Sequence, residues 1–218
     1  MKKIITTGLI LLSTTTLFAE TPKEVNAAFK IGTLGYGLDA STPINDTYSV
    51  RFNINGLNYS DSQSQDGNNY KGDLELFTAG ILVDAYPADN NFRITTGLYY
   101  NGNGFTGTVT PSATQTVELN GVTYTSADVA KVNADVSFNK IAPYFGIGWG
   151  NDARDKGWGF TFDLGALYHG KGTADLTAEG INNPAVNQAL AKEEASINDD
   201  LAGNKFYPVV ALGVNYTF

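Results

Sequence analysis

The chain of 218 residues contains no cysteine, one histidine and one methionine. The absence of cysteine excludes disulfides as a source of stability. Beyond the N-terminal segment there is no run of 18 or more apolar residues, which excludes a membrane-spanning helix. Basic residues are also scarce, 14 against 22 acidic ones, and the formal net charge of −8 argues against nucleic acid as a partner.

The first segment has the features of a secretory signal peptide. Lys2 and Lys3 precede an apolar run from Ile4 to Leu12, and Ala19 offers a small residue for cleavage. The alternative, a membrane helix, fits less well because the run is short and polar residues 13–16 interrupt it. We therefore predict a signal peptide at 1–19 and a single mature domain at 20–218.

The last segment, residues 205–218, alternates strictly between two kinds of side chain. Phe218, Tyr216 and Val214 share one face, and Thr217 and Asn215 share the other. An apolar face with terminal aromatic residues is typical of a strand in a transmembrane β-barrel. The ending resembles the signal that bacterial outer-membrane proteins present to the barrel-assembly machinery. This resemblance implies that Phe218 and Tyr216 form the assembly signal.

Similar alternation recurs through the chain and predicts the fold class. We expect an all-β protein, a closed antiparallel transmembrane β-barrel in the outer membrane, surrounded by outer-membrane lipid. Seven strands are visible, and because bacterial single-chain barrels have even numbers we place an eighth before Tyr36, within residues 27–33. A soluble lipocalin-like barrel, with apolar residues inside, is the alternative.

The connections alternate between short and long. We predict short periplasmic turns at 42–46, 87–91 and 151–156, and long external loops at 61–69, 101–133 and 170–204. Asn120-Gly121 indicates a hairpin in the second loop. Asn183-Pro184 and Gly203 indicate a short helix in the last loop. A change of phase near Asn139-Lys140 predicts a β-bulge.

Five charged residues are candidates for lining the lumen. Glu75 decides the faces of its strand, because a carboxylate facing hydrocarbon is costly, so we place it inward and the neighbouring leucines outward. Together these charges indicate one of two interiors. They either line a conduit that selects small charged solutes or form an ion-paired core that fills a narrow barrel. The lumen candidates are Arg51, Glu75, Arg93, Asp163 and Lys205.

Several segments resemble a known family of small proteobacterial barrels. They are residues 32–37 (GTLGYG), 98–101 (LYYN), 141–148 (IAPYFGIG) and 206–210 (FYPVV) with the acidic helix before them. These segments are similar to those of the carbapenem-susceptibility porin family. The resemblance implies an outer-membrane barrel associated with uptake of basic amino acids such as ornithine, and it transfers no binding residue.

No catalytic, cofactor or metal site is predicted. His169 has neither a serine nor an acid beside it, as a hydrolase would need, and we read it as a residue of the girdle or loop base. Glu193, Glu194, Asp199 and Asp200 offer carboxylates for Ca²⁺, but helical spacing spreads them along a solvated face.

Two functions remain open, and neither is enzymatic. One is a narrow channel or porin for small charged solutes. The other is a non-conducting structural or surface-interaction barrel that acts through its external loops.

Deleting Phe218 tests the assembly signal. Loss of one aromatic contact costs about 1–3 kcal/mol, so we expect the purified variant to refold in detergent. The amount in outer-membrane fractions, measured by immunoblot, should nevertheless fall sharply. A variant that reaches the membrane at normal levels but melts at a much lower temperature would show that Phe218 acts through stability.

Overall fold

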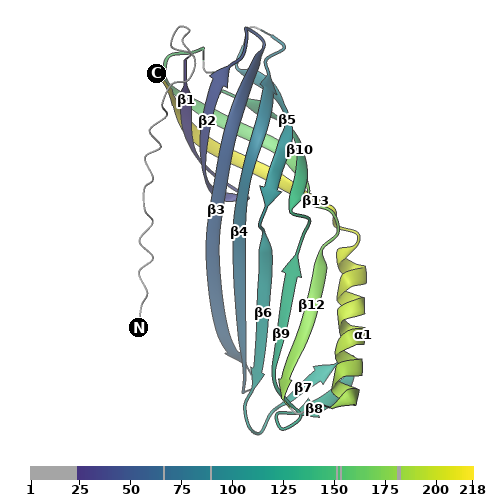
Figure 1. The fold of residues 1–218 in the computed structure, drawn as a ribbon. Helices are drawn as coiled ribbons and strands as arrows, with labels where there is room; N and C mark the ends of the chain where they lie inside the picture. The colour runs from purple at the N-terminus through teal and green to yellow at the C-terminus, as the bar shows by residue number, and fades with distance from the viewer. Residues whose placement is uncertain (1–23, 66, 89, 151, 153, 181–182) are drawn as a thin grey trace, which may run out of the picture.

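The computed structural model describes residues 24–218 except 66, 89, 151, 153, 181 and 182. The predicted signal peptide at 1–19 therefore lies outside the described residues. A tilted barrel occupies one end of the molecule, and a tall sheet flanked by one helix continues from it (Figure 1). Within the described part, no helix is long and apolar enough to cross a bilayer.

The barrel is a closed antiparallel ring of eight strands, as predicted. Its first strand pairs with its last, from Asn26 opposite Thr217 to Gly32 opposite Ala211, so the ring has no free edge in the membrane. The strands in ring order are β1 (Asn26–Gly32), β2 (Gly35–Pro43), β3 (Tyr48–Gln65), β4 (Asn68–Ala85), β5 (Phe92–Asn101), β10 (Ile141–Trp149), β11 (Gly157–Tyr168) and β13 (Phe206–Thr217).

The eighth strand lies where the sequence placed it. A tight turn at Thr33 and Leu34 separates β1 from β2. Gly35 follows this turn with φ +92, a backbone conformation that side-chain-bearing residues rarely adopt. The Gly-rich segment is therefore two strands of one hairpin.

The barrel strands present apolar side chains outward and polar ones inward. Trp158 and Phe160 are 80% and 81% exposed, the opposite of what a dry interior requires. The soluble alternative is therefore wrong. So many exposed apolar side chains form a surface suited to lipid. Others on the same surface include Phe29, Leu38, Ile54, Ile81, Leu98, Phe145 and Leu212.

The predicted faces of β4 are wrong. Leu82 is buried in the barrel, whereas Ile81 and Val83 face outward, and Glu75 shares their parity. The error arose from treating Glu75 as membrane-embedded. It pairs with Gly104 in the part of the sheet beyond the barrel, where water removes the cost of an outward carboxylate.

Beyond the barrel, β3 and β4 continue as the start of a second sheet, which we call the extension. Each has 18 residues, roughly 60 Å of strand, whereas a bilayer needs about 9–11 residues. The extension has the strand order β3-β4-β6-β9-β12, with β6 (Gly104–Pro111), β9 (Val129–Ser137) and β12 (Thr173–Gly180).

Much of the chain predicted as external loop is therefore regular structure. The predicted loop at 61–69 is mostly strand, and β6, β9 and β12 occupy parts of the other two loops. These strands escaped prediction because, outside the membrane, a strand needs no apolar outer face. The predicted bulge is also wrong, because residues 138–140 separate β9 in the extension from β10 in the barrel.

Two local predictions in the extension are confirmed. The hairpin of β7 (Thr116–Leu119) and β8 (Val122–Thr125) turns at Asn120 and Gly121, both with positive φ. The helix α1 (Pro184–Leu201) begins where expected, and the Asn183 side chain accepts a hydrogen bond from the Ala185 N–H.

Helix α1 gives the extension a core and covers one edge. Asn198 on the helix accepts from the Ala174 N–H of β12 at 2.8 Å and donates to its carbonyl at 3.1 Å. Glu194 accepts from the Leu176 N–H at 3.0 Å. The helix packs with the hairpin and β9 through Leu119, Tyr124, Val129, Val132, Val186, Ala189 and Leu190. The extension is thus a folded unit.

Because the chain lacks cysteine, single-cysteine variants can establish its orientation. On intact cells, Ser62→Cys at the exposed tip of β3 should react with a membrane-impermeant maleimide. Asp46→Cys, in a short turn at the opposite end, should react only after the outer membrane is permeabilised. Labelling of Asp46→Cys alone on intact cells would reverse the orientation.

Candidate functional site: the charged barrel lumen

Six charged side chains meet inside the barrel, and we call them the lumen cluster. They comprise three cations and three carboxylates, so the cluster is formally neutral. Each side chain is at most 6% exposed. Six strands supply one residue each: Lys30 (β1), Asp39 (β2), Arg51 (β3), Asp84 (β4), Arg93 (β5) and Asp163 (β11).

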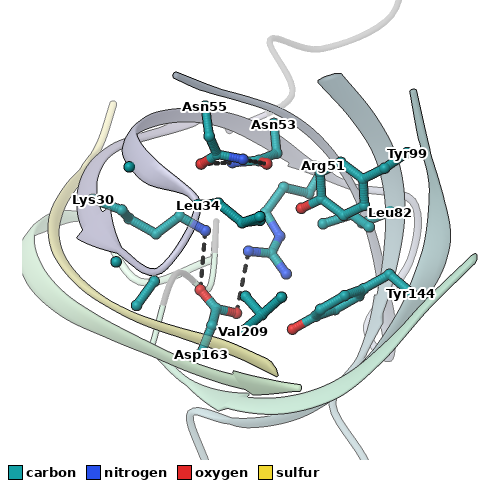
Figure 2. A pocket seen from close by; sticks show the side chains of 13 residues that line it. Lys30, Leu34, Arg51, Asn53, Asn55, Leu82, Tyr99, Tyr144, Asp163 and Val209 are labelled. Carbon is teal, nitrogen blue, oxygen red and sulfur yellow. Dashed lines mark hydrogen bonds and ion pairs between the residues drawn. The ribbon is translucent and has the colours of Figure 1, made fainter. Parts of the chain in front are cut away.

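Asp163 lies at the centre of the lumen cluster. Its carboxylate contacts Arg93 Nη2 at 2.6 Å, Lys30 Nζ at 3.0 Å and Arg51 Nη1 at 3.4 Å. Strand alternation explains the convergence, since each residue lies between outward-facing neighbours on its own strand. One acid therefore links cations from β1, β3 and β5, and Figure 2 shows its contacts with Lys30 and Arg51.

The other two carboxylates complete the pairing. Asp39 contacts Lys30 Nζ at 2.6 Å and Arg51 Nη1 at 3.1 Å. Asp84 lies 2.8 Å from Arg51 Nε and 3.6 Å from Arg93 Nε, and it also accepts a hydrogen bond from the Thr95 hydroxyl. Every charge thus has at least two partners, which burial in a low-dielectric interior demands.

An apolar layer separates the lumen cluster from the outer mouth. Leu34 reaches the barrel axis from the turn between β1 and β2 and lies among side chains from the surrounding walls (Figure 2). Its neighbours in this layer are Leu82, Tyr99, Ala142, Tyr144, Leu167 and Val209. The space remaining around these residues and the charges is ≈ 20 Å³, about enough for one water molecule.

The opposite end of the barrel carries a separate polar contact. Arg154, in the short turn after β10, donates from Nε to both Asp152 oxygens at 2.8 and 3.1 Å. Its guanidinium also lies 5.0 Å from the centre of the Tyr86 ring. The turn is thereby fixed against the end of β4.

The five lumen candidates lie in three places. Arg51, Arg93 and Asp163 lie in the lumen cluster. Glu75 is exposed on the extension, so its predicted inward position is wrong. Lys205 lies just before β13 and makes no ion pair among the described residues.

The two residues of the proposed assembly signal lie on the outer surface at the end of β13. Phe218 is 69% exposed, and its ring lies 5.0 Å from that of Tyr216. Tyr216 in turn contacts Trp158 of the neighbouring strand at 5.2 Å. These rings form part of an aromatic girdle at this end of the barrel.

Sequence reasoning missed half of the lumen cluster. Lys30 lies between Phe29 and Ile31, and Asp39 lies between Leu38 and Ala40, so alternation alone marks both as inward. Asp84 is missed because placing Glu75 inward puts Asp84 on the opposite, outward face of the same strand. Correct assignment of the inward and outward faces of every strand would have identified all three residues as lumen-facing.

Two solved structures are similar to this chain over most of its length. No family profile and no curated relative matches the chain. The crystal structure of Acinetobacter baumannii CarO2 is 24% identical, covers 90% of this chain and 99% of its own, and has a TM-score of 0.59. Acinetobacter baumannii CarO is 25% identical over 89% and 97%, with a TM-score of 0.58.

The chain has the fold of CarO. The resemblance inferred from the sequence is thereby confirmed, and it extends over nearly the whole of both CarO chains. Together with the closed ring and its apolar outer surface, the CarO fold makes this protein an integral barrel of the outer membrane.

Removing the central acid tests the importance of the lumen cluster. In Asp163→Asn, three buried cations face only two carboxylates, and we expect a loss of about 3–5 kcal/mol in unfolding free energy. Urea titration of the barrel in lipid vesicles measures this loss. Asp73→Asn, which removes an exposed pair with Lys71, is the matched control and should change little. Equal effects would contradict the role of the lumen cluster.

Proposed function

We propose that the protein is a non-conducting outer-membrane barrel that anchors and presents the extension at the cell surface. Of the two functions left open by the sequence, the structure favours this one. The observation that carries the proposal is the filled lumen, in which the lumen cluster and the apolar layer leave ≈ 20 Å³. A lumen filled in this way argues against the passage of solutes larger than water.

A channel would require large rearrangements in this barrel. A basic amino acid, the solute class implied by the family resemblance, would have to displace Leu34 and then separate ion pairs of Arg51 and Asp163. Each separated partner would be left buried without compensation, at a cost of several kcal/mol. The charges are therefore better suited to holding the barrel together than to selecting solutes.

The extension has the properties expected of a domain that contacts other molecules at the cell surface. It contains its own apolar core, and α1 covers the edge of β12. On the opposite side, residues 57–65 of β3 pair only with β4 among the described residues, which leaves a row of polar backbone groups accessible. Such an edge is suited to recognition of another surface.

We assign no enzymatic activity to the protein. His169 packs edge-to-face against Phe138 and Tyr207, with ring centroids 4.4 and 6.3 Å apart. Neither neighbour supplies the serine or carboxylate that a hydrolytic triad requires. The proposed activity is therefore one of surface presentation.

Planar-bilayer recording tests the closed lumen. The purified wild-type protein should insert without unitary conductance. Arg93→Ala should also remain silent, because Leu34 and the rest of the apolar layer still block the outer side of the lumen cluster.

The reconstituted samples need a folding control. Heat-modifiable gel mobility shows that each barrel is folded before recording. Reproducible wild-type steps whose size or selectivity changes in Arg93→Ala would contradict the proposal and support a channel for charged solutes.

A further inference from the structure

We propose that the protein binds a small, uncharged, amphipathic molecule in a cavity at the junction of the barrel and the extension. The cavity has a volume of ≈ 360 Å³ and is separate from the space inside the lumen cluster. It lies between the outer ends of the barrel strands, the first residues of β6 and the end of α1. We call it the junction cavity.

The walls of the junction cavity are mainly apolar. Phe105 and Phe138 contribute aromatic rings from the extension, and Tyr207 contributes a third from the start of β13. Leu76 and Leu201 close it from the barrel and from the helix. Apolar walls of this kind bind a ligand mainly by removing its carbon skeleton from water.

The size of the cavity limits the ligand. An apolar cavity of about 150 Å³ is known to hold benzene, so ≈ 360 Å³ has room for a molecule of about two rings. Volumes of about 300–1,000 Å³ are also typical of small-molecule sites. The junction cavity is therefore large enough for a dedicated ligand.

One polar atom at the cavity is buried without a partner among the described residues. His169 is 6% exposed, and its Nδ1 has no hydrogen-bond partner among the described residues. Asn103, on the same wall, is held in place because its carbonyl oxygen accepts a hydrogen bond from the Phe77 N–H at 2.9 Å. Unpaired polar groups in a buried site are costly, and a ligand that pairs with them gains that energy.

The chemistry of the unpaired His169 nitrogen defines the polar end of the ligand. Burial lowers the pKa of His169, which keeps the imidazole neutral at pH 7. Apart from this neutral imidazole, the cavity lining has no acidic or basic side chain, so a charged ligand would be left without a counter-charge. A hydroxyl group suits the unpaired Nδ1 of this imidazole, because it can act as a hydrogen-bond donor or acceptor.

Because His169 is the only histidine, it is a unique spectroscopic reporter of the cavity. The protein is labelled with ¹³C,¹⁵N-histidine, reconstituted in lipid nanodiscs and titrated with 2-naphthol, which has two rings and one hydroxyl. We expect a saturable shift of the His169 ring signals. Naphthalene, which lacks the hydroxyl, should bind about tenfold more weakly because one hydrogen bond is lost.

A pair of matched variants separates the cavity from partitioning into lipid. Val136→Phe fills the junction cavity and should abolish the saturable shift. Val109→Phe makes the same change in a neighbouring groove of the extension and should preserve it. Each variant must first show a wild-type circular-dichroism spectrum. No saturable shift in the wild type, or the same shift in Val136→Phe, would overturn the proposal.

A third variant tests the polar anchor. His169→Phe keeps a ring but removes both nitrogens, and calorimetry should show that its affinity for 2-naphthol falls to that for naphthalene. Naphthalene affinity should stay close to wild type. Equal loss for the two probes would overturn the assigned hydrogen bond. None of these outcomes depends on whether the barrel conducts.

Discussion

Eight strands enclose a lumen only wide enough for side chains, and in this protein charged side chains fill it. Burying six charges is tolerable only because each has partners of opposite sign, with Asp163 shared by three cations. This requirement links six of the eight barrel strands. It also fixes their relative register, since a slip of one residue would turn a charge toward lipid. The rest of the molecule is arranged on that ring.

Because the lumen is filled, groups that could contact other molecules must lie outside it. On the outer side of the membrane, the polar groups that remain accessible to water lie in the extension and at its junction with the barrel. The extension inherits its position from β3 and β4, which run without interruption from one sheet into the other. Two uninterrupted strands therefore join the barrel to the surface that carries the proposed function.

The barrel was predictable because lipid imposes a simple pattern on each strand. Apolar residues at alternate positions, as at Phe92, Ile94 and Leu98, gave strands and faces directly. The extension followed no such rule, since water on both sides allows polar residues such as Ser62 and Gln63 within a strand. Asp84 of the lumen cluster was missed for a related reason, because Glu75 on the same strand was judged by the membrane rule although it lies beyond the membrane.

The junction cavity could not have been found from sequence. Asn103, Phe138 and His169 are separated along the chain and meet only because β6, β9 and the end of β11 converge at the barrel mouth. Single polar residues in loops carry no pattern that distinguishes a cavity lining from an exposed surface.

Closure of the ring by β1 and β13 has a kinetic consequence. The pairing joins Asn26 to Thr217, so the contact that completes the barrel is also among the most distant along the chain. Contacts of this kind form slowly because the chain must lose the entropy of closing a long loop before any of them contributes favourable free energy. Until then both strands have an unpaired edge, and an open edge inside a bilayer leaves backbone groups without hydrogen bonds. Insertion therefore favours a route in which the barrel closes before or while it enters the lipid. The open sheet that precedes closure is the state of this protein most exposed to misfolding and aggregation.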